Sequence, residues 1–254
     1  MLKNLRKIFG IGAVIACLLS LFPQSVTGAP AIELSPDTGI VGTQVIVNGT
    51  GFGSSVWVGI YWDNFGNLLG ATQTTPTGTF SVPITIPQSV AGSHTVLARD
   101  ISGNSATAQF TVIPSLTISP DSGYVGDSVT VTLHGYAGNV WVTLYWDGVP
   151  WLSVPTTNVG SAQKSTQIPE LTGGYHILSG TDENGNTASV QFLVLSHITL
   201  SPQQGSYGDI VTVEGTGFAQ TAEVNLTMDS TYLATAYTND KGSFTALFSV
   251  PELP

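Results

Sequence analysis

The sequence predicts an all-β chain of tandem antiparallel β-sandwiches, the last of them incomplete. Three observations support this fold class: an internal repeat of about 84 residues, short apolar segments between turn signals, and no helical period beyond the first 31 residues. The composition agrees, because Gly (29) and Pro (14) accompany many Thr, Ser and Val residues and charged residues make up only 9%. Such a composition favours strands and turns over helices.

The repeat is carried by several motifs that stay in step. The segment Ser35-Pro36-Asp37-Thr38-Gly39 returns at offsets of 84 and 82 residues, beginning at Ser119 and at Ser201. Each copy is followed by a glycine, then by two valines separated by one residue, and then by a Gly-Phe or Gly-Tyr pair. In the first copy these begin at Gly42, Val45, Val47 and Gly51, in the second at Gly126, Val129, Val131 and Gly135, and in the third at Gly208, Val211, Val213 and Gly217. Three separate stretches in register indicate three structural units.

Each complete unit is expected to hold seven short strands. In the first repeat these are Ala31–Ser35, Gln44–Gly49, Val56–Trp62, Leu68–Gln73, Gly78–Ile86, Ser93–Arg99 and Ala106–Ile113. Seven strands with turns every 8–12 residues are typical of a sandwich of the immunoglobulin-like type. The expected organisation is a leader at 1–31, repeats at 32–114 and 115–196, and a third repeat at 197–254 that lacks its last two strands. This last feature predicts that the sequence was cut from a longer chain.

The first 31 residues have the order of a secretory signal peptide. Lys3, Arg6 and Lys7 precede the apolar run Ile8–Phe22, and the segment ends in small residues at Ala29-Pro30-Ala31. The alternatives are an uncleaved N-terminal anchor and, less favoured, lipid attachment at Cys17, the only cysteine. We therefore expect an exported chain that is extracellular or on the cell surface, with no disulfide and no thiolate site once the leader is removed.

Charge excludes one class of partner. Without the leader, three basic residues remain against 16 acidic ones, a net charge of −13. Such a chain repels phosphate backbones, so nucleic acid is not an expected partner. The membrane is expected to be contacted only through the leader or an anchor outside the repeats.

These motifs carry a family resemblance. The motifs that carry the resemblance in the first repeat are Ser-Pro-Asp-x-Gly, a Val-x-Val strand, Gly-Thr-Gly-Phe (49–52), Ser-His-Thr-Val (93–96) and Asp-x-x-Gly-Asn (100–104). The repeats resemble the IPT/TIG-type immunoglobulin-like repeats of bacterial and archaeal surface and secreted proteins. The resemblance covers nearly all of the chain after the leader. It implies fold and setting but not one function, since such modules serve as spacers, adhesins and accessory domains of secreted enzymes. The second repeat departs from the motif at Leu133-His134.

No catalytic motif, cofactor site or metal site is predicted. His94 and His176 occur once per repeat at matching places, which favours strand residues over catalysts. Asp63, Asp147 and Asp229 end the third strand of each repeat, and turn capping is the favoured role for these side chains. Calcium is a less favoured alternative, and the densest acidic cluster for it is Asp182, Glu183 and Asn184.

The third strand of each repeat carries the candidate binding residues. Residues at alternate positions of a strand face opposite sides of the sheet. One face is apolar in every repeat, as in Val58, Ile60 and Trp62, and is expected to face the core. The other face holds Trp57, Tyr61, Trp141 and Tyr145 in the first two repeats and is polar in the third. Exposed aromatic side chains stack on sugars or anchor proteins; the alternative is that these four pack on neighbouring strands or on the adjacent module.

The sequence therefore predicts a non-catalytic spacer, adhesion or binding module. A polysaccharide or a cell-envelope protein is the expected kind of partner. The second hypothesis is a carbohydrate-binding accessory region of a larger secreted enzyme, whose catalytic domain would lie beyond residue 254.

Overall fold

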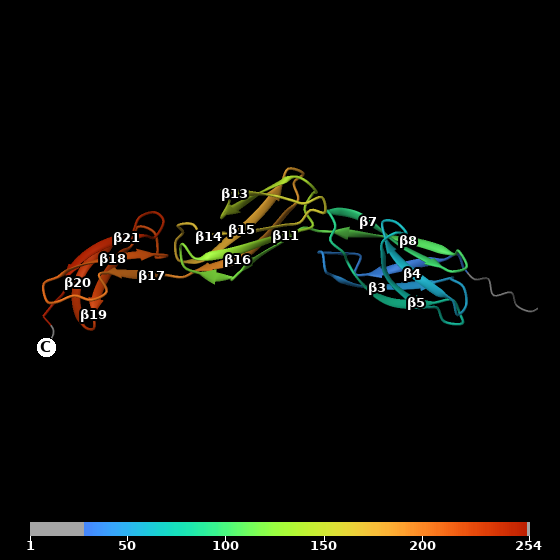
Figure 1. Cartoon of the computed structure of the whole chain (residues 1–254), viewed down its shortest axis with the longest axis horizontal. Helices are drawn as coiled ribbons and strands as arrows, with labels where there is room; N and C mark the ends of the chain where they lie inside the picture. The colour runs from blue at the N-terminus through green and yellow to red at the C-terminus, as the bar shows by residue number, and fades with distance from the viewer. Residues whose placement is uncertain (1–27, 253–254) are drawn as a thin grey trace, which may run out of the picture.

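The computed structural model describes residues 28–252, which form three β-rich units in a row (Figure 1). Within this range every regular element is a strand, and no helix is long and apolar enough to cross a membrane. Residues 1–27 of the predicted leader, Cys17 among them, lie outside the described residues. The first strand already includes Ala31, which pairs with Thr50. The first strand thus has the bounds expected from the sequence, Ala31–Ser35.

Unit 1 is a two-sheet sandwich. Its strands are β1 (Ala31–Ser35), β2 (Thr38–Gly39), β3 (Gln44–Thr50), β4 (Trp57–Trp62), β5 (Leu68–Gln73), β6 (Phe80–Thr85), β7 (Gly92–Asp100) and β8 (Ser105–Val112). One sheet has the order β1-β3-β6 and the other β2-β8-β7-β4-β5. This is the arrangement of an immunoglobulin-like sandwich, and it confirms the fold class expected from the sequence.

Unit 2 repeats this topology strand for strand. Its strands are β9 (Ser115–Ser119), β10 (Ser122–Gly123), β11 (Ser128–His134), β12 (Trp141–Trp146), β13 (Val149–Pro155), β14 (Ala162–Gln167), β15 (Gly174–Asp182) and β16 (Thr187–Val194). The three-stranded sheet is β14-β11-β9 and the five-stranded sheet is β10-β16-β15-β12-β13.

The first strand of each complete unit is split between the two sheets, a feature that the expected count of seven strands missed. β1 pairs with β3, whereas the two-residue β2 pairs in parallel with β8. The change of sheet occurs at Pro36, which has no backbone N–H and cannot continue the first ladder. Beyond it, the carbonyl of Asp37 accepts a hydrogen bond from the Thr111 backbone N–H at 2.9 Å. The Ser-Pro-Asp-x-Gly motif is thus the point where the chain crosses between sheets.

Unit 3 has two smaller sheets. They are β17-β18-β21 and β19-β20, with bounds β17 (His197–Ser201), β18 (Ile210–Thr216), β19 (Glu223–Met228), β20 (Thr231–Tyr237) and β21 (Phe244–Ser249). Residues 197–252 contain no strand in the places of β7 and β8. Consequently Leu200 is 40% exposed, whereas its equivalent in unit 2, Ile118, is 7% exposed.

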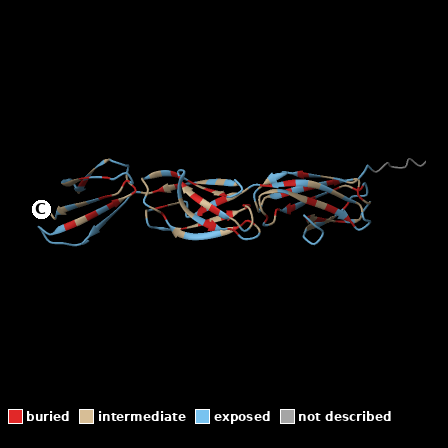
Figure 2. Ribbon diagram, turned by 90° about the horizontal axis from the view of Figure 1, so that it is seen from above, coloured by how far each residue is buried: buried red, intermediate tan, exposed pale blue. Residues whose placement is uncertain are grey.

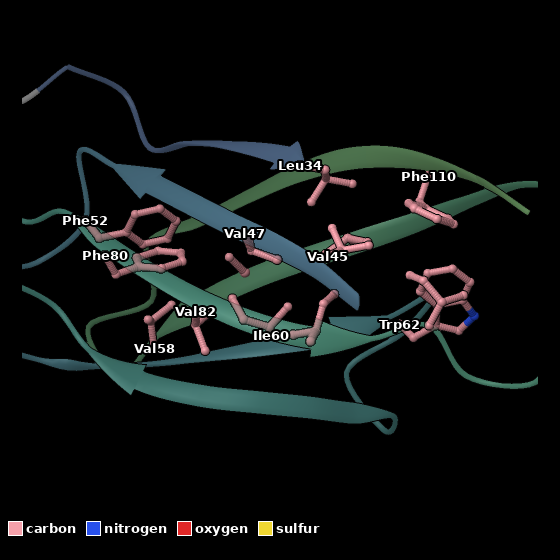
Figure 3. Packing of buried hydrophobic residues seen from close by; sticks show 14 of the residues in the cluster. Leu34, Val45, Val47, Phe52, Val58, Ile60, Trp62, Phe80, Val82 and Phe110 are labelled. Atoms are coloured by element: carbon pink, nitrogen blue, oxygen red, sulfur yellow. The ribbon is translucent and has the colours of Figure 1, made fainter. Parts of the chain in front are cut away.

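The cores of units 1 and 2 lie between their two sheets. Figure 2 shows buried positions alternating with exposed ones along the strands, the pattern that strand geometry requires. In unit 1, Val45 and Val47 from one sheet meet Val58 and Ile60 from the other (Figure 3). Unit 3 has a smaller core, in which the buried cluster is Val213, Leu226, Ala236 and Phe244.

Candidate functional site

Strand β4 presents its two faces as the alternation of its residues predicted. Val58 and Ile60 are 0% exposed and Trp62 is 4% exposed, all within the core, whereas Trp57 is 57% exposed. The close-up of unit 1 shows the three core side chains of β4 projecting between the sheets (Figure 3). The predicted assignment of faces is therefore confirmed for this strand.

Strand β12 repeats the same arrangement in unit 2. Val142 and Leu144 are 0% exposed, whereas Trp141 is 53% exposed. Tyr145 lies on the same outward face and is half-buried. Two units thus place an exposed indole at the same strand position, on the outer side of the larger sheet.

Tyr61 is the one predicted binding residue with clear packing partners. Its ring lies across Gly59, because a Cβ at Gly59 would fall 2.8 Å from Cζ of that ring. The Tyr61 ring also meets Phe65 edge to face, with centroids 5.3 Å apart. The predicted alternative, packing on neighbouring side chains, therefore holds in part for Tyr61, which is half-buried rather than free.

A broad hollow of about 500 Å³ lies over this face of unit 1. Its lining includes Trp57, Tyr61, Leu68, Arg99 and Ile101. Sequence reasoning found the first two of these residues and missed the other three. The strand pairing brings them together, since Gly59 of β4 is opposite Ala71 of β5 and Arg99 of β7.

Unit 3 has a polar surface where units 1 and 2 have aromatic residues. On β19, Asn225 accepts a hydrogen bond from the Thr235 hydroxyl at 2.8 Å, and Glu223 accepts one from the Tyr237 hydroxyl at 3.4 Å. The outward aromatic residues of the third strand are therefore confined to the first two units, whereas in unit 3 the exposed Tyr232 and Tyr237 stand on the paired strand β20.

The aspartates and histidines that recur in units 1 and 2 form structural pairs. Asp63 accepts hydrogen bonds from Nδ1 of His94 at 2.8 Å and from the backbone N–H of Thr95 at 2.9 Å, and the His94 ring stacks on Trp62 with centroids 4.8 Å apart. In unit 2, Asp147 pairs with His176 at 2.6 Å. The histidines are strand residues, as predicted, but the aspartates clamp a neighbouring strand rather than capping only their own turn.

The pKa of Asp147 shows the balance of forces in this pair. Partial burial acts to raise the pKa, but hydrogen bonds from the Ile177 backbone N–H and from His176, together with the His176 charge, lower it below its ordinary value. The ionised carboxylate is therefore the form that fits the fold.

Asp182 was a candidate calcium ligand, and the structure gives it another role. Its carboxylate, 5% exposed, accepts hydrogen bonds from the backbone N–H groups of Ala137 (2.8 Å), Asn184 (2.9 Å) and Asn186 (2.9 Å) and from the Asn186 amide (2.8 Å). Burial acts to raise its pKa, and these hydrogen bonds lower it. Within residues 28–252 no group of three or more His, Cys, Asp or Glu side chains could hold a metal ion.

An equivalent backbone hydrogen bond joins the units at each junction. The backbone N–H of Ala91 donates to the Tyr136 carbonyl at 3.2 Å, and that of Gly173 donates to the Phe218 carbonyl at 3.1 Å. Gly135 has φ of +67°, and a Cβ there would lie 2.8 Å from the carbonyl oxygen of Ile113. Glycine at this position therefore lets the end of one unit approach the next.

Comparisons with known proteins describe the fold alone. No protein-family model and no curated relative matches the chain. Among solved structures, a tetra-tandem repeat from the extending region of a large adhesion protein is 18% identical with a TM-score of 0.31, covering 87% of this chain and 66% of that one. Invasin, a bacterial integrin-binding protein, is 15% identical with a TM-score of 0.31, covering 89% and 55%. The BSP domain of a biofilm-associated protein is 20% identical with a TM-score of 0.24, covering 66% and 29%. The chain thus spans less than two thirds of each of these structures.

Proposed function

We propose that this protein is an exported, non-catalytic adhesion and spacer module built from immunoglobulin-like repeats of the IPT/TIG type. In this role the outward aromatic face of units 1 and 2 contacts a polysaccharide or a protein of a cell envelope. The observation that carries the proposal is the matched exposure of two indoles, Trp57 at 57% and Trp141 at 53%, at equivalent strand positions.

Leaving an indole exposed to water does not contribute to the stability of the fold. Burying an aromatic ring is favourable, and its flat apolar surface accepts the C–H face of a sugar ring or an apolar anchor of a protein. A large exposed aromatic side chain that recurs in the same place therefore supports a contact role.

Two equivalent sites on one chain act together. Once one site is occupied, the second binds its partner at an effective concentration set by the connection between the units. The connection here is short: β8 ends at Val112 and β9 begins at Ser115. The repeated hydrogen bond at the junction, Ala91 to Tyr136, supports a limited range of orientations.

The leader-like segment at 1–31 supports export, and the acidic remainder of the chain agrees with a surface setting. The Ser-Pro-Asp-x-Gly motif, which makes the crossing between sheets in units 1 and 2, supports the attribution to IPT/TIG-type repeats.

The test is retention on isolated cell envelopes and on insoluble polysaccharides. The fluorescently labelled chain is compared with the double variant Trp57→Ala/Trp141→Ala and with the control Tyr207→Ala, which removes an aromatic ring that is 73% exposed in unit 3. We expect the double variant to lose most of its retention and the control to keep it. Equal retention of all three proteins would refute the contact role of the aromatic face.

A further inference from the structure

Glycine at position 59 allows the Tyr61 ring to lie along the hollow of unit 1. The Tyr61 ring occupies the space that a side chain at position 59 would fill, with its hydroxyl oxygen 2.6 Å from an ideal Cβ there. The ring thus forms part of the lining beside the exposed Trp57, and the two make an aromatic wall for an elongated ligand. In unit 2 the equivalent position is Thr143, whose hydroxyl bonds to Ser153 at 3.2 Å.

Arg99 is the cation of this hollow. It is exposed, it pairs with Gly59 across the strands, and its guanidinium carbon lies 5.2 Å from the centre of the Phe65 ring. Stacking on a ring orients the guanidinium while leaving its N–H donors free. Within residues 28–252 the only ion pairs are those of His94 and His176, so no carboxylate of this part of the chain is paired with Arg99.

Asp100 is also among the residues that line the hollow, but its carboxylate is not an ion-pair partner of Arg99. Adjacent strand residues face opposite sides of the sheet, and Asp100 is 4% exposed whereas Arg99 is on the outside. Its carboxylate accepts hydrogen bonds from the N–H groups of Gly53 (2.8 Å), Ser102 (2.9 Å) and Asn104 (2.9 Å) and from the Asn104 amide (2.8 Å). These four donors occupy the carboxylate on the inner side.

We infer that the hollow of unit 1 is a subsite for an acidic polysaccharide. A sugar ring stacks on Trp57 beside Tyr61, and the carboxylate of that uronic acid receives the N–H donors of Arg99. A planar guanidinium matches a carboxylate through two parallel hydrogen bonds, and this geometry selects a carboxylate over a hydroxyl. The inference rests on the proposed function in taking the outward face as a contact surface.

The site is specific to unit 1. Unit 2 has Thr181 in the position of Arg99, opposite Thr143, so its Trp141 has no cation beside it. The net negative charge of the chain opposes a long anionic polymer, as it opposes nucleic acid, so the inference concerns a short acidic segment at this one site, where charges more than about 8 Å away are largely screened at physiological salt.

The experiment compares two polymers that differ only in the carboxylate. Binding of the full chain to polygalacturonate oligomers and to the same oligomers after carboxyl reduction is measured by isothermal titration calorimetry in buffered physiological salt. The variants are Arg99→Gln, the conservative Arg99→Lys and the control Lys164→Gln, which removes one positive charge from an exposed strand of unit 2. Thermal melts confirm that each variant is folded.

We expect the acidic oligomer to bind about tenfold more tightly than its reduced form, a difference typical of one charge-assisted contact. Arg99→Gln should abolish this preference, Arg99→Lys should keep part of it, and Lys164→Gln should leave it intact. Equal affinity for the two oligomers, no binding of either, or an unchanged preference in Arg99→Gln would each overturn the inference. None of these three outcomes affects the retention on envelopes that depends on Trp57 and Trp141, so that assay tests the proposed function separately.

Discussion

The buried carboxylate of Asp182 allows a quantitative test of what holds each sandwich together. It links the β15–β16 turn to the segment before β12 through four hydrogen bonds of 2.8–2.9 Å, one of which comes from Ala137, 45 residues away in sequence. Asp182→Ala removes all four acceptor contacts. The donors of Asn184 and Asn186 lie at an accessible turn and can bond to water, whereas the half-buried Ala137 N–H loses its partner.

Hydrogen bonds to a charged group each contribute about 1.5–3 kcal/mol, and they do not add fully. Allowing for hydration of the turn donors, we expect Asp182→Ala to lower the free energy of unfolding of unit 2 by about 2–4 kcal/mol. Glu183→Ala, at the exposed adjacent position, is the matched control and should change stability by less than about 0.5 kcal/mol.

The assay is denaturant unfolding followed by tryptophan fluorescence. All five tryptophans lie in units 1 and 2, at positions 57, 62, 141, 146 and 151, so unit 1 serves as an internal reference. A loss for Asp182→Ala no larger than that for Glu183→Ala would refute the argument that this carboxylate joins the turn to the rest of the sandwich.

Three further predictions address acid, the junction and the third unit. The pKa values of Asp100, Asp147 and Asp182 are lowered in the fold, so their stabilisation is complete above the unfolded value of about 3.9 and is lost as pH falls through the folded values. The melting temperature should therefore drop below about pH 4, and a rise on acidification would contradict the assignment. Gly135→Ala, at a residue with φ of +67°, should lower the free energy of unfolding by about 1–3 kcal/mol and speed proteolysis near Ile113. The control Gly70→Ala, whose Cβ would lie 3.6 Å from its nearest atom, should have neither effect. As separate pieces, 32–114 and 115–196 should show cooperative thermal melts by circular dichroism and 197–254 should not, because its buried cluster is much smaller; a cooperative melt of the third piece would contradict this.

The sequence predicted most strands to within one or two residues because repetition and alternation are local signals. The sequence did not predict the two-residue strands β2 and β10, because they form only by pairing with β8 and β16, which lie about 70 residues away. The proline in Ser-Pro-Asp was the available signal, since it forces a ladder to end.

The candidate site was predicted only along one strand. Alternation on β4 and β12 correctly separated Trp57 and Trp141 from the core, but Leu68 and Arg99 reach the hollow from β5 and β7, and Ile101 reaches it from the turn after β7. Their approach is set by strand order, which the sequence does not show. The clamps between Asp63 and His94 and between Asp147 and His176 were missed for the same reason, although the recurrence of both residues in two units was a usable signal.

The central claim is that Trp57 and Trp141 serve contact and not packing, and the unfolding free energy of the double variant Trp57→Ala/Trp141→Ala tests it most directly. Both side chains are more than half exposed, so we expect each unit to lose no more than about 0.5 kcal/mol in denaturant titrations followed by far-ultraviolet circular dichroism. Trp62→Ala is the reference for a buried tryptophan, since Trp62 is 4% exposed on the core face of β4, and it should lower the free energy of unfolding by about 3–5 kcal/mol. If the double variant instead loses several kcal/mol per unit, the outward tryptophans are part of the fold's packing and the account of this face is wrong.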